Sequence, residues 1–241
     1  MFRARRLVMT LSAVALAASV GATTAMPAHA STGSGTSSGT GARERGFQDC
    51  PALSELPEGA DPSQWRCEAM TAVGHLTLGR ARVPIDRPLA ITFAEGRVDG
   101  EFRQVFGAMA ATPLRVRGTP LSITPRYGGY SDFESNDERR GELDLTFRIT
   151  GPGVPPGCSL GSEADPVHLV LKETDPPEVV TQDPLVVSFG VEDNRFAVPR
   201  TSGCGRLGHL LDKVLRLPSP AGGNSIDLDA RVALRSYGES G

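Results

Sequence analysis

The chain has 241 residues, with 25 lysines and arginines against 28 aspartates and glutamates. The net charge of −3 argues against a nucleic-acid-binding protein, because such a protein carries a basic patch or stripe. The 28 glycines and 19 prolines predict many turns and argue against a helical bundle.

Residues 1–30 have the three parts of a secretory signal peptide. Three arginines lie within residues 3–6, residues 7–20 carry no charge, and an A-x-A cleavage motif ends at Ala30. The sequence therefore predicts a secreted protein that begins near Ser31. A spanning helix needs about 20 apolar residues, and no run of that length follows residue 30. We therefore expect no transmembrane segment in the mature protein. General secretory and twin-arginine export both remain open.

Residues 31–45 consist mostly of Ser, Gly and Thr, and almost none of their side chains could be buried. This composition predicts a flexible tether. Residues 46–241 are then expected to form a single disulfide-linked β-domain. An extracellular or cell-envelope partner fits this organisation, whether the domain is released or retained at the envelope.

Four cysteines follow the signal peptide, and in an exported chain they predict disulfides. Pairing Cys50 with Cys67 and Cys158 with Cys204 is favoured because it closes two local loops, although two other pairings exist. No Cys-x-x-Cys spacing is present, so the cysteines indicate neither a metal site nor a redox motif. No metal or cofactor is predicted.

Beyond residue 66, apolar side chains recur at every second position, which is typical of strands with one buried face. The predicted strands are residues 72–78, 81–85, 89–94, 102–106, 114–117, 143–149, 167–171, 185–191 and 226–235. The apolar phase changes at Gly79, where we expect a β-bulge. Strands separated by Gly, Pro and Asp turns predict a mainly β fold, an antiparallel β-sandwich-like domain.

One helix is predicted, at residues 206–217, and Pro218 ends it. Its apolar side chains fall on one stripe, which we expect to pack on the sheet. The stripe consists of Leu207, Leu210, Leu211, Val214 and Leu215.

The C-terminal half carries an ordered set of short motifs. They are a Cys-x-x-Gly-Ser turn at 158–162, D-N-x-F-A-V-P at 193–199, Gly-Cys-Gly at 203–205 and L-P-S-x-A-G-x-N at 217–224. In order and spacing this pattern, within residues 140–236, resembles a group of exported actinobacterial proteins of unknown function. The resemblance implies an exported, disulfide-linked β-domain and assigns no catalytic residue.

An aromatic, glycine-rich segment is the candidate binding loop. Tyr127, Tyr130 and Phe133 lie close together, with two glycines between the tyrosines. Tyrosine offers a large contact area at a small cost in conformational entropy, which suits a glycan or a protein partner. A loop that packs on itself is the alternative.

No catalytic residue can be assigned from motifs. The histidines His75, His168 and His209 form no metal-binding spacing, and no G-x-S-x-G elbow precedes the helix. Ser202 suits a tight turn better than a nucleophile. The acidic segment 132–138 lacks the central glycine and terminal glutamate of a calcium-binding loop.

We therefore expect a non-enzymatic domain that binds an envelope component or an extracellular partner. One alternative is a small extracellular hydrolase with a carboxylate site, which a deep cleft with converging acids would favour. The other is a carrier of a hydrophobic ligand, which an apolar cavity between sheet and helix would favour. A flat face with exposed aromatics would favour partner binding.

Overall fold

The structure is a computed structural model that describes residues 46–238, all of which belong to one compact unit. The predicted signal peptide of residues 1–30 and the predicted tether of residues 31–45 lie outside the described residues.

The described chain is mainly β, with one short α-helix, as predicted. Its elements, in chain order, are η1 (Leu53–Glu55), η2 (Pro62–Gln64), β1 (Arg66–Leu78), β2 (Ala81–Val98), β3 (Glu101–Ala110), β4 (Leu114–Arg115), β5 (Ser122–Asp132), β6 (Gly141–Thr150), β7 (Ser159–Leu160), β8 (Val167–Gln182), β9 (Leu185–Asp193), β10 (Thr201–Ser202), η3 (Gly205–Leu207), α2 (Gly208–Leu215) and β11 (Ser225–Ser236).

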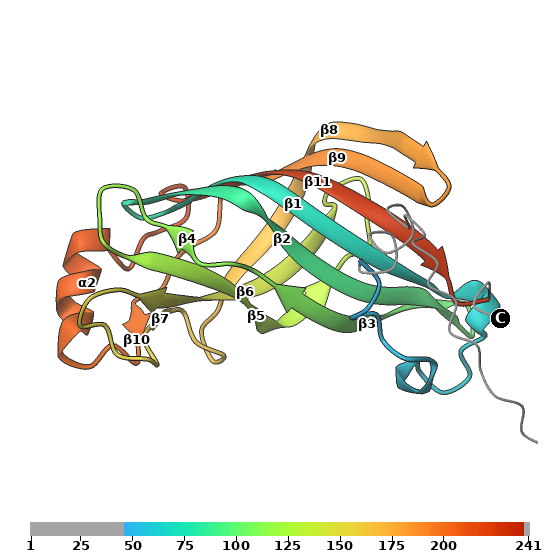
Figure 1. The fold of residues 1–241 in the computed structure, drawn as a ribbon, viewed down its shortest axis with the longest axis horizontal. Coiled ribbons are helices and arrows are strands. Elements are labelled where there is room, and N and C mark those ends of the chain that lie inside the picture. Colours follow the sequence, from blue (N-terminus) through green and yellow to red (C-terminus); the bar gives the residue numbers. More distant parts are fainter. Residues whose placement is uncertain (1–45, 239–241) are drawn as a thin grey trace, which may run out of the picture. The chain divides into compact units, whose positions relative to one another are not determined.

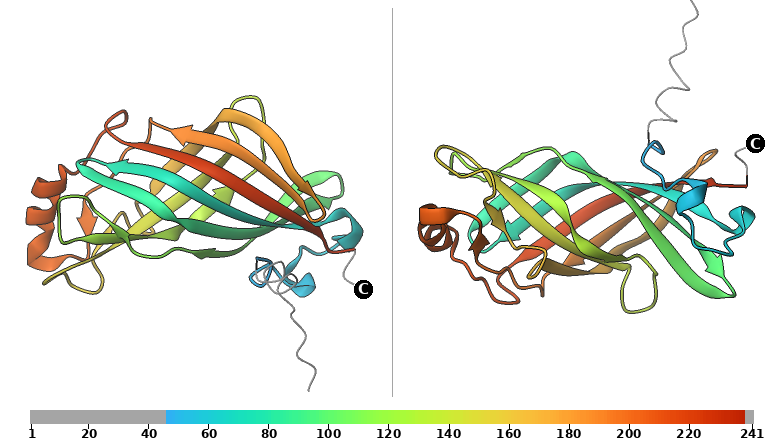
Figure 2. Two further views of the ribbon diagram at one scale, coloured as in Figure 1. Left: turned by 45° about the horizontal axis from the view of Figure 1, so that its top comes forward. Right: turned by 90° about the horizontal axis from the view of Figure 1, so that it is seen from below.

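The strands form one sheet, in the order β10-β7-β6-β8-β9-β11-β1-β2-β3, with β5 added on β6 and β4 on β5. Each of these pairings is antiparallel. The sheet curls, so that β2 and β3 come against β4 and β5 and the two halves face each other (Figures 1 and 2). This confirms the predicted antiparallel, sandwich-like arrangement.

The period of two is clearest in β6, where Leu143, Leu145, Phe147 and Ile149 are buried and the residues between them are half-buried. The prediction of a bulge at Gly79 is wrong. Gly79 (φ 59°) lies in the turn between β1 and β2, so the phase changes because the chain reverses there. The register of β1 against β2 shifts instead between Ala72 and Gly74.

The helix α2 lies within the predicted range but is shorter, because Arg216 adopts a left-handed conformation (φ 56°) that ends it. Only part of the predicted apolar stripe is covered. Leu211 and Leu215 are buried, whereas Leu210 and Val214 are 56% and 45% exposed. One sheet-facing position is instead polar, since the buried Asp212 accepts hydrogen bonds from the backbone and hydroxyl of Thr201. A stripe on a helical wheel cannot reveal such a polar anchor.

Both disulfides have the favoured pairing, Cys50–Cys67 and Cys158–Cys204. The first attaches the N-terminal segment to β1. The second joins the turn before β7 to the turn that precedes η3 and α2.

The half of the interior nearest α2 is filled by large side chains. The side chains of Leu78, Leu114, Ile123, Phe147 and Leu160 are at most 1% exposed. The β1–β2 turn is tied to the helix, because the backbone N–H of Arg80 donates to the carbonyl of Leu215. This end of the domain is therefore closely packed, and any space for a ligand lies toward the other end.

Candidate functional site: an apolar cavity with a carboxyl pair

A cavity of about 210 Å³ lies between the facing halves of the sheet. Its walls come from β1, β2, β3, β6, β8, β9 and β11 and are almost entirely aliphatic or aromatic. The apolar lining residues are Met70, Ala72, Leu89, Ile91, Phe93, Met109, Phe133, Leu143, Leu145, Leu169, Leu171, Pro177, Val187, Phe189, Val191, Ile226, Leu228, Ala230, Val232 and Leu234. Apart from Phe133, which follows β5, and the exposed Pro177, they lie on the inward positions of their strands, so the same period of two that builds the core also lines the cavity.

The cavity exists because short side chains meet at one level of the sheet. Ala72 of β1 and Ala230 of β11 are cross-strand neighbours, and both are buried and line the cavity. Toward the α2 end the inward positions hold larger residues: Leu76 and Ile226 are also neighbours, and of these two only Ile226 still lines the cavity. Two adjacent alanines leave a volume that the opposite wall does not fill.

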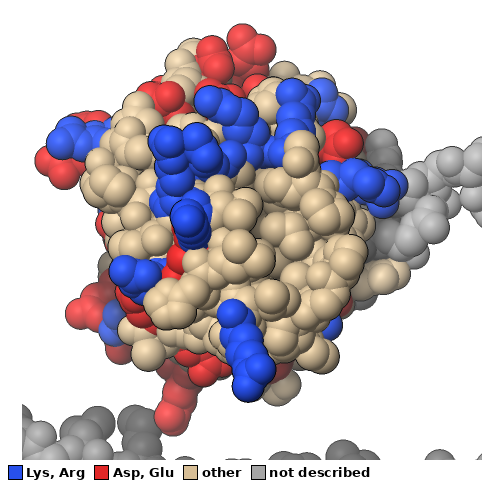
Figure 3. Space-filling view, turned by 90° about the vertical axis from the view of Figure 1, so that its left-hand side faces the viewer, with Lys and Arg blue, Asp and Glu red and all other residues tan. Residues whose placement is uncertain are grey.

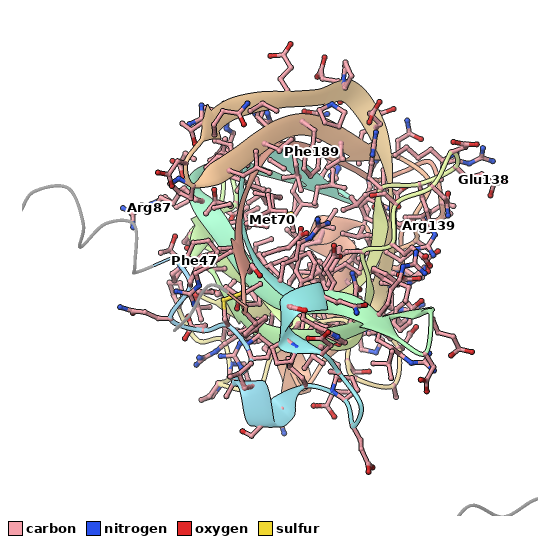
Figure 4. All side chains as sticks on the ribbon, turned by 90° about the vertical axis from the view of Figure 1, so that its right-hand side faces the viewer. Phe47, Met70, Arg87, Glu138, Arg139 and Phe189 are labelled. Carbon is pink, nitrogen blue, oxygen red and sulfur yellow. A yellow bond between two sulfur atoms is a disulfide. The ribbon has the colours of Figure 1, made fainter. Side chains whose placement is uncertain are left out.

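The cavity meets solvent at the end of the sheet away from α2, where its lining includes the exposed residues Ser135 and Pro177. Seen from that end, Met70 and Phe189 lie toward the enclosed interior, whereas Arg87 and Glu138 point away from it (Figure 4). The opposite end presents a continuous surface with many cationic side chains (Figure 3). A ligand would therefore enter from the end shown in Figure 4.

A polar cluster with two nearly buried carboxyls lies beside this opening. Arg66 and Glu68 come from β1, and Glu95 is the cross-strand neighbour of Arg66 on β2. The Nε of Arg66 donates to Oε1 of Glu68 (2.8 Å) and to Oε1 of Glu95 (3.0 Å). Both carboxyl side chains are only 11% exposed, and Glu68 itself lines the cavity.

Hydrogen bonds hold Glu95 in place. Gln104 of β3 donates from Nε2 to Oε2 of Glu95 (3.2 Å), and its own Oε1 accepts the backbone N–H of Phe133 (2.9 Å). The Phe133 ring stacks on Phe93, with 4.6 Å between centroids. The polar cluster and the apolar wall thus support one another through Gln104.

The two carboxyls compete for a single arginine. Burial and the nearby charge of Glu95 raise the pKa of Glu68 to about 8, although Arg66 opposes the shift. Removing a carboxylate from water disfavours its charged form, and a second carboxylate disfavours it further. At neutral pH Glu68 therefore holds a proton.

This proton predicts a pH dependence of stability. An unfolded chain releases the Glu68 proton near pH 4.5, whereas the folded chain keeps it to about pH 8. The native state thus binds more protons across this window, so the free energy of unfolding contributed by Glu68 falls as pH rises, by at most about 1.4 kcal/mol per pH unit.

Urea melts at pH 5, 6, 7 and 8 check this expectation. Glu68→Gln should become progressively more stable than the wild type as pH rises, because glutamine has no proton to lose. The exposed Glu101, paired with Arg103, supplies the control Glu101→Gln. A stability difference between Glu68→Gln and wild type that does not change with pH would contradict the buried proton.

This cluster was not among the sites predicted from the sequence. The predicted strand 89–94 ends just before Glu95, but β2 continues to Val98 and places Glu95 on the inward face. The alternation along the strand contained the signal: Arg66 and Glu68 lie on the same face of β1 as the apolar residues Met70 and Ala72. Charged residues on the apolar parity of a strand indicate a buried polar site.

The candidate aromatic loop is not a single aromatic face. Tyr127 and Tyr130 belong to β5, and Tyr127 is half-buried and stacks on Phe106 with 3.8 Å between centroids. Tyr130 is 43% exposed, and its hydroxyl donates to Glu142. Phe133 is directed to the cavity. The structure therefore separates these three residues, and only Phe133 contributes to the cavity.

The other candidate residues from the sequence are exposed at the surface. His168 is exposed and lies 2.7 Å from Asp144, and His75 and His209 are exposed. Ser202 is exposed in β10. Within residues 46–238, no group of three or more His, Cys, Asp or Glu side chains is arranged to hold a metal ion. Across the same residues, no helix has the length and apolarity to cross a membrane.

A scan against protein-family models, a search of curated proteins and a search of solved structures each found no match for this chain.

Proposed function

We propose that this domain is a non-enzymatic, exported binding protein that carries a hydrophobic or amphiphilic small molecule, such as an envelope component, in the cavity between the halves of its sheet. The observation that carries the proposal is the apolar cavity of about 210 Å³, open at one end and closed at the α2 end. Small-molecule sites are characteristically concave and apolar, with a few polar groups that set the orientation of the ligand.

The volume sets the size of the ligand. An apolar cavity of about 150 Å³ in a protein interior is large enough to bind benzene. A cavity of about 210 Å³ therefore has room for a somewhat larger apolar group, such as a short acyl chain. Each buried methylene stabilises the complex by about 0.8 kcal/mol, so even a short chain gains measurable affinity.

The geometry favours a carrier over a hydrolase. Glu68, which lines the cavity, and Glu95 beside it share Arg66 and interact directly with each other. A glycosidase needs its two carboxyl groups about 5–10 Å apart, with the scissile bond between them. Glu68 and Glu95 both lie within hydrogen-bond distance of the one Nε of Arg66 and contact each other, which leaves no place for a substrate bond between them.

A cavity-filling variant tests the proposal. Calorimetric titration with 1-octanol should show saturable binding to the wild type. Ala230→Phe should lower the affinity at least tenfold, because the ring occupies the space beside Ala72 and Ala230 between the facing halves of the sheet. The folded state should keep or increase its stability, since filling a void is one of the usual stabilising changes.

Thr71→Phe is the matched control. Thr71 is adjacent to Ala72 on β1 but exposed, so the added ring lies outside the cavity and octanol affinity should not change. Absence of octanol binding to the wild type, or equal loss in the two variants, would overturn the proposal. Native mass spectrometry of the exported protein would then identify any ligand that is retained from the cell.

A further inference from the structure

The Arg66–Glu68–Glu95 cluster is short of one positive charge. Two carboxyls share one guanidinium, and the Arg66 side chain is 52% exposed whereas both carboxyls are nearly buried. The only other charged side chain that lines the cavity among the described residues is Arg140, which is paired with Glu173 of β8. Two buried carboxylates on one guanidinium leave a negative charge uncompensated, which is costly, so the empty site is balanced by a proton on Glu68.

The carboxyl that lacks its own positive partner lies in the wall of the cavity. Glu68 precedes Met70 and Ala72 on the inward face of β1, so its carboxyl lies in the same wall as the apolar lining. Its cross-strand neighbours are Phe93 on β2 and Leu234 on β11, both of which also line the cavity. A molecule whose tail fills the cavity would therefore present its polar end to Glu68.

From this arrangement we propose that the cavity selects amphiphiles whose polar end is an ammonium group, with Glu68 as the anion that receives it, over neutral amphiphiles and over carboxylates of the same length. The inference rests on the proposed carrier function and specifies the chemical class of its ligand.

Charge balance describes the binding step. In the empty site Glu68 is protonated; when an alkylammonium ion enters, the Glu68 proton leaves to solvent and the ammonium takes its place as the counter-charge. The other charged groups near Glu68 are Arg66 on the same strand and Glu95 on β2, while Arg140, which also lines the cavity, forms an ion pair with Glu173. A carboxylate ligand would instead add a third negative charge to the cluster.

The proton release predicts the pH dependence. Octylammonium affinity should rise by about tenfold per pH unit below the Glu68 pKa of about 8 and level off above it. The amine itself stays charged throughout, because alkylamines titrate near pH 10.4, like lysine. The affinity of 1-octanol should be independent of pH over the same range.

The experiment compares octylammonium, 1-octanol and octanoate by calorimetry at pH 6, 7 and 8. We expect octylammonium to bind the wild type at least tenfold more tightly than octanol at pH 8, and octanoate to bind most weakly. Calorimetry in buffers of different ionisation enthalpy should show close to one proton released per octylammonium bound at pH 6. Glu68→Gln should abolish the preference for the amine, the proton release and the pH dependence, and leave octanol affinity unchanged.

Glu101→Gln is the matched control, because it removes an equal charge on the outer surface and should preserve the amine preference. If octanol binds but octylammonium binds no more tightly, the ammonium inference is wrong and the carrier function stands. The same conclusion follows if Glu68→Gln and Glu101→Gln reduce the preference equally. If no ligand of the three binds, the carrier function itself fails.

Discussion

Replacing Cys158 and Cys204 together by serine is expected to lower the free energy of unfolding by about 4 kcal/mol, in the chain-entropy account of disulfides. The bridge spans 46 residues of sequence, and this segment contains β7, β8, β9 and β10. Since a domain of this size is stable by only about 5–15 kcal/mol, the loss is a large share of the total. Cys158 and Cys204 are also buried, so the two serine hydroxyls need new hydrogen-bond partners.

The matched comparison is the pair Cys50→Ser and Cys67→Ser, whose bridge spans 17 residues. The same account gives it about 3 kcal/mol. Denaturant melts of both double variants under identical conditions check the ranking. A larger loss from the N-terminal pair would show that native contacts around Cys50, and not loop length, decide the contribution of each bridge.

The second large effect is expected from Asn224→Ala, at about 3–5 kcal/mol of lost stability. The Asn224 side chain is buried; its Oδ1 accepts the backbone N–H of Gly79 (2.8 Å), and its Nδ2 donates to the carbonyls of Phe196 (2.9 Å) and Pro220 (3.0 Å). Alanine removes the partner of the Gly79 N–H and of the Phe196 carbonyl, whereas the Pro220 carbonyl still accepts the Gly223 N–H (3.0 Å). Each buried group left unpaired costs about 1–3 kcal/mol, and the loss of the bond to Pro220 adds to this.

Asn224 connects three segments at the α2 end: the β1–β2 turn, the chain after β9 and the loop before β11. Its loss should therefore loosen the closed end of the sheet, which hydrogen exchange of the Gly79 amide would report. The control is Asn194→Ala, since Asn194 is exposed and its replacement should change stability by no more than about 0.5 kcal/mol. Equal effects of the two changes would refute the anchoring role of Asn224.

These positions give a structural meaning to the motifs of the C-terminal half. Cys158 and Cys204 form a bridge, Val198 and Ser219 pair as an isolated antiparallel bridge, and Asn224 binds the carbonyl of Phe196. The motifs therefore meet one another in space and hold the turns around α2. The resemblance to exported actinobacterial proteins itself stays a prediction, and within this chain its motifs serve the framework and not the cavity.

Local patterns in the sequence determined much of the fold. Alternation placed Leu143, Leu145, Phe147 and Ile149 on a buried face, and loop length indicated both disulfides. These features depend on residues that are close along the chain, or on the period of two that every strand with one buried face shows. The stripe indicates the helix, but the helix ends at Arg216 through the left-handed conformation of that residue. The burial of Asp212 in place of Leu210 and Val214 depends on tertiary hydrogen bonds from Thr201.

The cavity and its carboxyl pair were decided only by the tertiary structure. Ala72 and Ala230 lie far apart in sequence, and the space between the halves of the sheet arises because antiparallel pairing makes them neighbours while the opposite wall stays at a distance. Glu68 and Glu95 look like ordinary surface acids in the sequence. Curling of the sheet turns both inward against a single arginine, and burial then changes the protonation of Glu68. A composition or a period records which residues can be buried, but which of them share one cavity follows from the register of distant strands.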